Sequence, residues 1–245
     1  MIADENFDAA AEALNTSLLW DTLFNLSWTP ESEPKQAVIR KSDGKVNLSL
    51  DPSAWGGQPI FVLNKLSDIR VSKSLWTGAR DYSLTAYARW DRDYLYLGYR
   101  VYDDDYMPKF NTADCVEVYI DAELMKDYGH GSYNEDDFNL KLIPPASAAD
   151  KCEVFLYHGT KTGNKLKDNV NGIKVTGKEL KDGFQIAAAV PWSKLGITPE
   201  PGLKIGFDLA TFDGDKGKFK NSMMWSAPGN ELFICPRVMG RVTLE

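Results

Sequence analysis

A regular alternation of side chains in the middle of the chain limits its possible folds more than any other feature. In YLYLGYRVY, residues 94–102, every second side chain belongs to one apolar set, and the pattern returns in CVEVYID, residues 115–121. A period of two places successive side chains on opposite faces of a β-strand, one in a core and one presented outward. The outward faces carry tyrosines, Arg100 and Glu117. Such faces are suited to holding a polar ligand.

Short strand-like segments separated by turn signals continue along the chain. The sequence SDGK predicts a hairpin between strands at 36–41 and 45–50, and the WGGQP turn precedes an apolar strand at 60–63. Helical signals are confined to residues 5–14 and 192–195. Further strands are predicted at 152–158, 170–175, 184–190, 204–213 and 240–244. This pattern predicts an all-β fold, an antiparallel β-sandwich of the immunoglobulin-like or jelly-roll type.

The length of the chain allows one large domain with an additional segment. Its 245 residues are 43% hydrophobic, which is ample for a core. We predict a β-sandwich over residues 64–245 and an N-terminal extension over residues 1–63 that packs on it. The extension could instead be the remnant of a preceding module, and other modules of a larger parent protein are expected partners.

Charge and hydropathy narrow the classes of partner. A net charge of -7 argues against nucleic acid, which requires a basic stripe. No apolar stretch approaches the roughly 20 residues needed to cross a bilayer. The N-terminus lacks the basic start and apolar core of an export signal. We nevertheless expect an extracellular or cell-envelope location, since a start at Met1 also fits a chain from which such a signal was trimmed.

The three cysteines, Cys115, Cys152 and Cys235, are widely spaced. An odd number without CxxC pairs predicts neither a disulfide framework nor a zinc site. Three ordinary thiols, or one disulfide and one free thiol, are both compatible with this spacing.

Catalytic devices are weakly represented, and we predict that the chain is not an enzyme. Hydrolysis of a glycoside by paired carboxylates needs two of them facing each other. Most aspartates here occur in turns, where aspartate is a common turn residue. Glu117 alone clearly points away from the core. Neither histidine is accompanied by a nucleophile signature such as GxSxG.

Calcium is a better match to the acidic residues than catalysis. Asp103, Asp104 and Asp105 place three carboxylates in one loop, and hard cations favour such oxygen clusters. We predict a structural calcium ion at these residues. A solvated acidic loop is the alternative.

Two loop phenylalanines are candidates for ligand contact. Phe110 and Phe233 each lie in a polar, turn-rich loop that precedes a strand. Aromatic rings bind sugars by stacking on their apolar C–H faces, while polar side chains bond the hydroxyl groups. The alternative for either residue is a position in the core.

From about residue 66 to residue 245 the chain resembles the family 9 carbohydrate-binding modules and related β-sandwich domains. The resemblance rests on motifs in a fixed order: WTGA, ARWDRDYLYLGYRVYDDD, ADCVEVYID, EDDFNLKL, DGFQIAAAVPWSKLGITPEPGLKIGFDLATFDGD, MMWSAP and PRVMGRVTL. It implies an antiparallel sandwich whose concave sheet, with loop aromatics, binds the end of a sugar chain. It also implies structural calcium, which is common in the family.

The resemblance assigns ligand-binding roles to particular residues. The family's two clamp tryptophans correspond to Phe110, displaced by one residue, and to Phe233. The motif acid is kept as Glu117, and the asparagine before the second clamp is kept as Asn230.

At other positions of the family's sugar pocket, this chain has different residues. An expected arginine and asparagine correspond to Asn139 and Lys141, and a glutamine corresponds to Ala210. Alternation independently places Glu117, Asn139 and Lys141 on outward faces. Glucose- or xylose-type specificity is therefore not expected to carry over.

Two other functions are compatible with the sequence. The first is a structural or protein-interaction sandwich that has lost sugar binding. The second is a haem b domain, because relatives of this sandwich hold haem through a methionine and a histidine or lysine. The candidate axial ligands are Met107, Met125, Met223 or Met239 with Lys141, His130 or His158.

Overall fold

The structure is a computed structural model that describes residues 33–49, 51–108, 114–124, 132–147, 149–160, 165–233 and 235–245. Within these residues, regular structure consists of β-strands and short 3-10 turns, so the all-β prediction is confirmed. The predicted helix at 5–14 lies outside the described residues. No helix in the described part of the chain has the length and apolarity to cross a membrane.

The larger sheet has nine strands in the order β1-β14-β12-β6-β7-β8-β9, with β13 paired to β12 and β3 paired to β13. Its strands are β1 (Gln36–Ile39), β3 (Ile69–Val71), β6 (Cys115–Asp121), β7 (Asp137–Ile143), β8 (Glu153–Gly159), β9 (Lys165–Asp168), β12 (Lys204–Asp215), β13 (Lys218–Met224) and β14 (Gly240–Leu244). All pairings in this sheet are antiparallel except the parallel pairing of β1 with β14.

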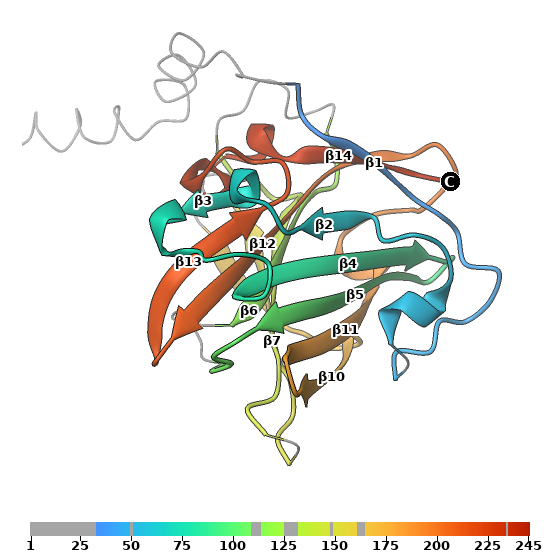
Figure 1. The fold of residues 1–245 in the computed structure, drawn as a ribbon. Coiled ribbons are helices and arrows are strands. Elements are labelled where there is room, and N and C mark those ends of the chain that lie inside the picture. Colours follow the sequence, from blue (N-terminus) through green and yellow to red (C-terminus); the bar gives the residue numbers. More distant parts are fainter. Residues whose placement is uncertain are drawn as a thin grey trace, which may run out of the picture.

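The smaller sheet is antiparallel and has five strands in the order β10-β11-β5-β4-β2. Its strands are β2 (Phe61–Leu63), β4 (Tyr82–Trp90), β5 (Tyr94–Asp103), β10 (Lys174–Leu180) and β11 (Gly183–Pro191). In Figure 1 β4, β5, β11 and β10 form one layer, with β6 and β7 behind it.

The hydrophobic core fills the space between the two sheets. Phe61 of β2 stacks on Phe207 of β12 with ring centroids 5.3 Å apart, and Tyr82 of β4 bonds Thr211 of β12 through its hydroxyl group at 2.6 Å. The alternation in β5 and β6 is confirmed, because its apolar set is buried in this core. The buried residues of that set are Leu95, Leu97, Tyr99, Val101, Val116, Val118 and Ile120.

The N-terminal extension contributes to both sheets in its described part. β1 pairs with β14 of the larger sheet, and β2 pairs with β4 of the smaller sheet. The division into residues 1–63 and 64–245 stays a prediction. The described cysteines Cys115, Cys152 and Cys235 are all free thiols.

The predicted SDGK hairpin is wrong. Only Gln36–Ile39 forms a strand, and the described residues 45–49 form none. The backbone N–H of Lys41 donates to Glu245 O, and that of Ser42 donates to Trp90 O at 2.7 Å. Pairing with distant segments has therefore replaced the local pairing that the turn residues favour.

Two other predictions of local structure had different outcomes, and one strand was not predicted. Residues 170–173 form a turn between β9 and β10 rather than the start of a strand. β13 was not predicted, because its many polar residues show no clear alternation of apolar and polar side chains. It pairs with β12 across the turn at Lys216 and Gly217. The helical turn predicted at 192–195 is confirmed as η4 (Trp192–Lys194).

Candidate functional site

The outer face of the larger sheet carries neighbouring polar and aromatic side chains. The register sets Glu117 of β6 beside Lys141 of β7, and Tyr119 of β6 beside Asn139 of β7. These four residues alternate with core residues, so their side chains leave the sheet on the side away from the core. The outward positions predicted for Glu117, Asn139 and Lys141 are those found.

The Glu117 carboxylate gathers three partners on this face. Lys141 Nζ lies 3.0 Å from Glu117 Oε1, Asn139 Nδ2 donates to Oε2 at 3.2 Å, and the Tyr119 hydroxyl group donates to the same oxygen. Glu117 is 8% exposed, and Asn139 and Lys141 are each 7% exposed. Charge-assisted hydrogen bonds are strengthened by the low dielectric of such a site. The group is therefore fixed in orientation, and we call these four residues the Glu117 cluster.

The pKa values of Lys141, within the cluster, and of Lys165, beside it, are shifted in opposite directions. Burial lowers the pKa of Lys141, but its acidic neighbours Cys115 and Glu117 outweigh burial and the pKa lies above its ordinary value. Burial lowers the pKa of Lys165 on β9 to about 8. Lys165 Nζ lies 4.0 Å from the ring centroid of Tyr133, a cation–π distance.

In the segment 225–239, Ala227, Leu232, Val238 and Met239 pack on the same outer face and form a second apolar cluster there, whereas Trp225 belongs to the main core. The buried members of this second cluster are Tyr119, Tyr133, Ala210, Met224, Ala227, Leu232, Val238 and Met239. Asp208, which is fully buried on β12, fixes the start of this segment by accepting hydrogen bonds from the backbone of Ser226 and Ala227 at 3.1 and 2.8 Å. Sequence reasoning missed this anchoring role of Asp208.

Phe233 lies at the border between this apolar cluster and the Glu117 cluster. It ends η5 (Asn230–Phe233) and is half-buried. Its ring centroid is 6.1 Å from that of Tyr119 and 6.2 Å from that of Phe212, and the Phe212 ring lies nearly parallel to it. Phe212 also lies below Lys141 Nζ at 5.8 Å. The structure thus brings Phe233 to the polar residues predicted from the sequence.

The remaining predicted ligand residues are placed differently. Asn230 is exposed at the start of η5, and among the described residues no hydrogen bond joins it to the Glu117 cluster. Phe110 lies outside the described residues. Phe212 and Tyr119 were not selected from the sequence, although their outward positions follow from the alternation of β12 and β6.

The three consecutive aspartates do not form one cluster. Asp103 groups with Asp114 and Asp213, whereas Asp104 groups with Asp81 and Asp215. Asp105 instead accepts a hydrogen bond from the Lys216 backbone N–H at 3.1 Å. Neighbouring residues at the end of a strand point to opposite sides, which separates Asp103 from Asp104. The predicted three-residue site is corrected to two clusters with one of these residues in each.

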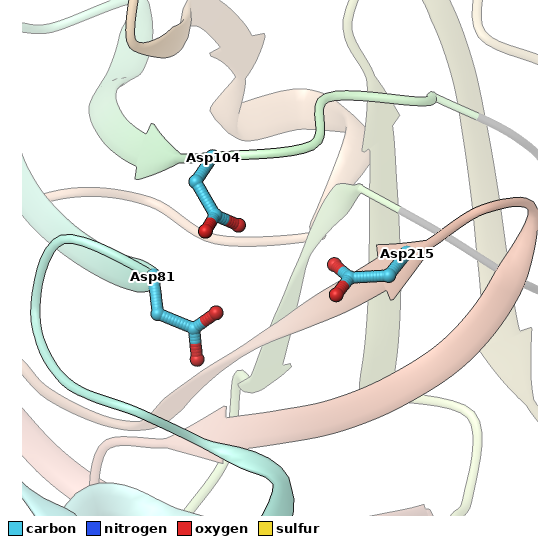
Figure 2. A group of neighbouring side chains, drawn as sticks. All are labelled: Asp81, Asp104 and Asp215. Carbon is cyan, nitrogen blue, oxygen red and sulfur yellow. The ribbon is translucent and has the colours of Figure 1, made fainter.

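The partly exposed cluster already contains a cation. Figure 2 shows the side chains of Asp81, Asp104 and Asp215 converging from three segments. Lys220 Nζ forms ion pairs with Asp81 and, at 2.9 Å, with Asp215. Burial lowers the pKa of Lys220, but hydrogen bonds to Asp215 and Asp81 raise it above its ordinary value. We call this group the Lys220 cluster.

The second cluster, here called the buried trio, consists of Asp103, Asp114 and Asp213 at one end of the core. The three side chains are 4%, 0% and 1% exposed. Each continues the inward-facing positions of its strand: Asp103 follows Val101 by two residues, and Asp114 precedes Val116 by two. This register is the signal from which the sequence could have identified the trio.

The oxygen atoms of the buried trio fit a hard cation. Asp103 Oδ2 and Asp213 Oδ1 are buried without a hydrogen-bond partner. One member of the trio, Asp213, forms a long ion pair with Lys220 Nζ at 3.8 Å. Burial raises the pKa of Asp213 to about 8, and burial also raises the pKa values of Asp103 and Asp114. The three carboxylates also repel one another when they are charged. A shared proton or a bound cation would each relieve this repulsion.

Two of the haem ligands considered from the sequence, Met223 and Lys141, do not share one site. Met223 is fully buried between the sheets, whereas Lys141 lies on the opposite side of the larger sheet in an ion pair with Glu117. Met239 is enclosed in the apolar cluster of segment 225–239. Met125 and His130 lie outside the described residues.

The chain is similar to one protein family and to several solved structures. The family described as carbohydrate family 9 binding domain-like matches residues 53–245. A family 9 carbohydrate binding module from Caldicellulosiruptor kristjanssonii in complex with cellotriose has a TM-score of 0.59 and 17% identity, covering 86% of this chain and 94% of that chain. A structure of such a module from the same organism in complex with glucose has a TM-score of 0.59 and 16% identity, covering 86% and 96%. These structures confirm the β-sandwich fold. No curated protein matches the chain.

Proposed function

Because this chain belongs to the family 9 carbohydrate-binding domains, we propose that it binds a sugar or the end of a polysaccharide chain at the Glu117 cluster. The family is a family of non-catalytic binding modules, so the expectation that the chain is not an enzyme is confirmed. The recognition mode proposed here combines the oriented polar groups with stacking on Phe233. An extracellular or cell-envelope location, and other modules of a parent protein as partners, belong to the same proposal.

The observation that carries this proposal is the position of an aromatic ring beside an oriented polar group. The Glu117 carboxylate can accept hydrogen bonds from sugar hydroxyl groups, and Lys141 and Asn139 can donate to them. Phe233 supplies an apolar surface for the C–H face of the ring. Polar groups at fixed positions beside aromatic surface are the usual composition of a small-molecule site.

Calorimetric titration with cellotriose and glucose, followed by a glycan array, tests the proposal. We expect Phe233→Ala to abolish binding and Phe233→Trp to retain it, since tryptophan also offers a stacking face. We expect Glu117→Gln to weaken binding by about tenfold through loss of a charge-assisted hydrogen bond. Phe219→Ala and Glu153→Gln are matched controls at exposed positions. Unchanged affinity in both Phe233→Ala and Glu117→Gln would refute this site.

A structural or protein-interaction role is favoured by one observation. The Glu117 carboxylate is already paired with Lys141, and both side chains are nearly buried. A ligand must therefore compete with an internal ion pair. If no sugar on the array binds the folded wild-type protein, this second function replaces the first.

We further propose that the buried trio holds a structural calcium ion. Asp103, Asp114 and Asp213 would supply its oxygen ligands, and the ion would neutralise their mutual repulsion. The support is the pair of buried carboxylate oxygens without hydrogen-bond partners. The trio joins the ends of β5, β6 and β12, two of which carry residues of the sugar site. Calorimetric titration of metal-free protein with calcium tests this site, and absence of binding would leave the shared proton as the explanation.

A further inference from the structure

A second polar pocket lies on the opposite side of the sandwich from the Glu117 cluster. Its volume is about 480 Å³, within the range of small-molecule sites. Arg89 of β4 forms its floor, between the core residues Ala88 and Trp90, so its side chain leaves the outer face of the smaller sheet. The walls are formed by residues 40–47 and 54–57.

The pocket concentrates positive charge in a protein whose net charge is -7. Four cationic side chains line it, those of Arg40, Lys41, Lys45 and Arg89, against the single carboxylate of Asp43. Within the described part of the chain, none of the four cations forms an ion pair with a carboxylate. An excess of positive charge in a concave site attracts anions.

The Arg89 guanidinium group is held in place by the WGG turn. Arg89 is 9% exposed and donates to its neighbour's carbonyl, Ala88 O, at 2.9 Å and also to Gly56 O. Gly57 has a φ of 78°, which favours glycine, and a Cβ atom there would lie 2.4 Å from Arg89 Nη2, so that the guanidinium group would have to move. These contacts are all to neutral carbonyl groups. The guanidinium charge is therefore oriented but not neutralised.

An aromatic ring lines the same pocket. Trp55 ends η1 (Pro52–Trp55), and its indole N–H donates to Asn47 O at 3.2 Å. On the other side, its ring packs directly over Gly98 of β5, where a Cβ atom would lie 2.8 Å from the indole. Trp55 is partly exposed. A fixed aromatic surface beside cations suits a ligand that has both an apolar face and an anionic group.

We propose that this pocket binds an anionic sugar unit, a uronate or a sulfated monosaccharide, with its charge on the cationic side chains and its ring against Trp55. Membership of a carbohydrate-binding family favours a saccharide over other anions of this size. The proposal concerns a site separate from the Glu117 cluster, and binding at one does not require the other. The chain would then have saccharide sites on two faces.

The experiment is calorimetric titration of the full chain with trigalacturonate, a sulfated galactan oligosaccharide, cellotriose and inorganic sulfate, at low and high salt. We expect one anionic saccharide to bind, with affinity falling at high salt because exposed charges are screened. The exposed double variant Arg40→Ala/Lys45→Ala should lower that affinity at least about tenfold. The matched double variant Lys181→Ala/Lys204→Ala removes the same charge elsewhere and should have little effect.

The variants also separate this site from the sugar site proposed above. Phe233→Ala should leave anionic saccharide binding intact, and Arg40→Ala/Lys45→Ala should leave intact the binding of a neutral saccharide at the Glu117 cluster. Equal losses in the two double variants would reduce the effect to net charge and overturn the proposal. Competition by inorganic sulfate as strong as that of the saccharides would overturn the saccharide assignment. No binding of any anionic probe would overturn the site itself.

Discussion

The Lys220 cluster and the buried trio are neighbours in the fold, but the negative charge of their aspartates is balanced in different ways. The Lys220 cluster combines the buried Asp81, the half-buried Asp215 and the exposed Asp104, and Lys220 pairs with the first two. One oxygen of Asp215 is buried without a hydrogen-bond partner. The buried trio has almost no exposure, and two of its oxygens have no hydrogen-bond partner. Buried charge is tolerated when it is paired, and otherwise it takes up a proton or a metal ion. Lys220 reaches both clusters, but its Nζ lies 2.9 Å from Asp215 and 3.8 Å from Asp213, and no ion pair of Asp103 or Asp114 is found among the described residues. The charge of the buried trio is therefore the less compensated of the two, which makes the trio the better candidate for a metal site.

Removal of the internal cation should produce the largest effect. Lys220→Met leaves Asp81 and Asp215 without their ion pairs, and loss of one partner of a nearly buried pair costs about 3 kcal/mol. Chemical denaturation measures this loss in the free energy of unfolding. Lys218→Met, on the same strand but exposed, is the matched control. Calcium should recover part of the loss, because the two clusters then become alike. Equal stability of the two variants would contradict the role of Lys220.

Local patterns predicted the faces of this sandwich because alternation depends only on neighbouring residues. They placed Glu117, Asn139 and Lys141 outward, and the structure agrees. They could not predict that Glu117 and Lys141 are directly paired, since the register of β6 with β7 is fixed by the whole sheet. The failed hairpin at SDGK has the same cause, because Glu245 and Trp90 are far away in sequence.

Residues that are adjacent in the sequence do not necessarily form one metal site, as the three consecutive aspartates show. Asp103, Asp104 and Asp105 are consecutive, but the alternation of the strand end sends them to different environments. Asp103 meets Asp213, more than 100 residues further along the chain. Only the tertiary pairing of strands brings these two together. The inward register of each aspartate was readable from the sequence, but their common location was not.

Calcium should stabilise the protein through the buried trio. A ligand present at 100 times its dissociation constant adds about 2.7 kcal/mol to the free energy of unfolding, provided it binds only the folded state. We expect calcium to raise the thermal midpoint of metal-free protein, and Asp213→Asn or Asp103→Asn to remove that increase. Asp215→Asn, from the Lys220 cluster, should keep it. An increase that survives both buried substitutions would place the ion elsewhere.

The pH dependence of stability should distinguish a bound cation from a shared proton. The pKa of Asp213 is raised from 3.8 to about 8, so between these pH values the folded protein holds a proton that the unfolded chain has lost. Without metal, the stability contribution is complete below about pH 4 and is lost as the pH rises from there through about 8, by about 1.4 kcal/mol per pH unit. Calcium should flatten this slope, because it binds the deprotonated carboxylates. Denaturant titrations from pH 5 to 8, with calcium or chelator, measure both slopes. A flat profile in chelator would contradict the assignment.

The smallest change in stability is expected for substitution of Asp104. The sequence predicted this residue as a calcium ligand together with Asp103, but the structure places it in the other acidic cluster. Asp104 lies next to Asp103 in the chain but belongs to the Lys220 cluster, and it is exposed. Asp104→Asn removes one repulsive charge at the surface, so stability should change by less than about 0.5 kcal/mol. The increase in thermal midpoint caused by calcium should be the same as in the wild-type protein. If Asp104→Asn instead abolishes that increase, the ion is bound in the cluster of Figure 2, and Lys220 does not take the place of a metal there.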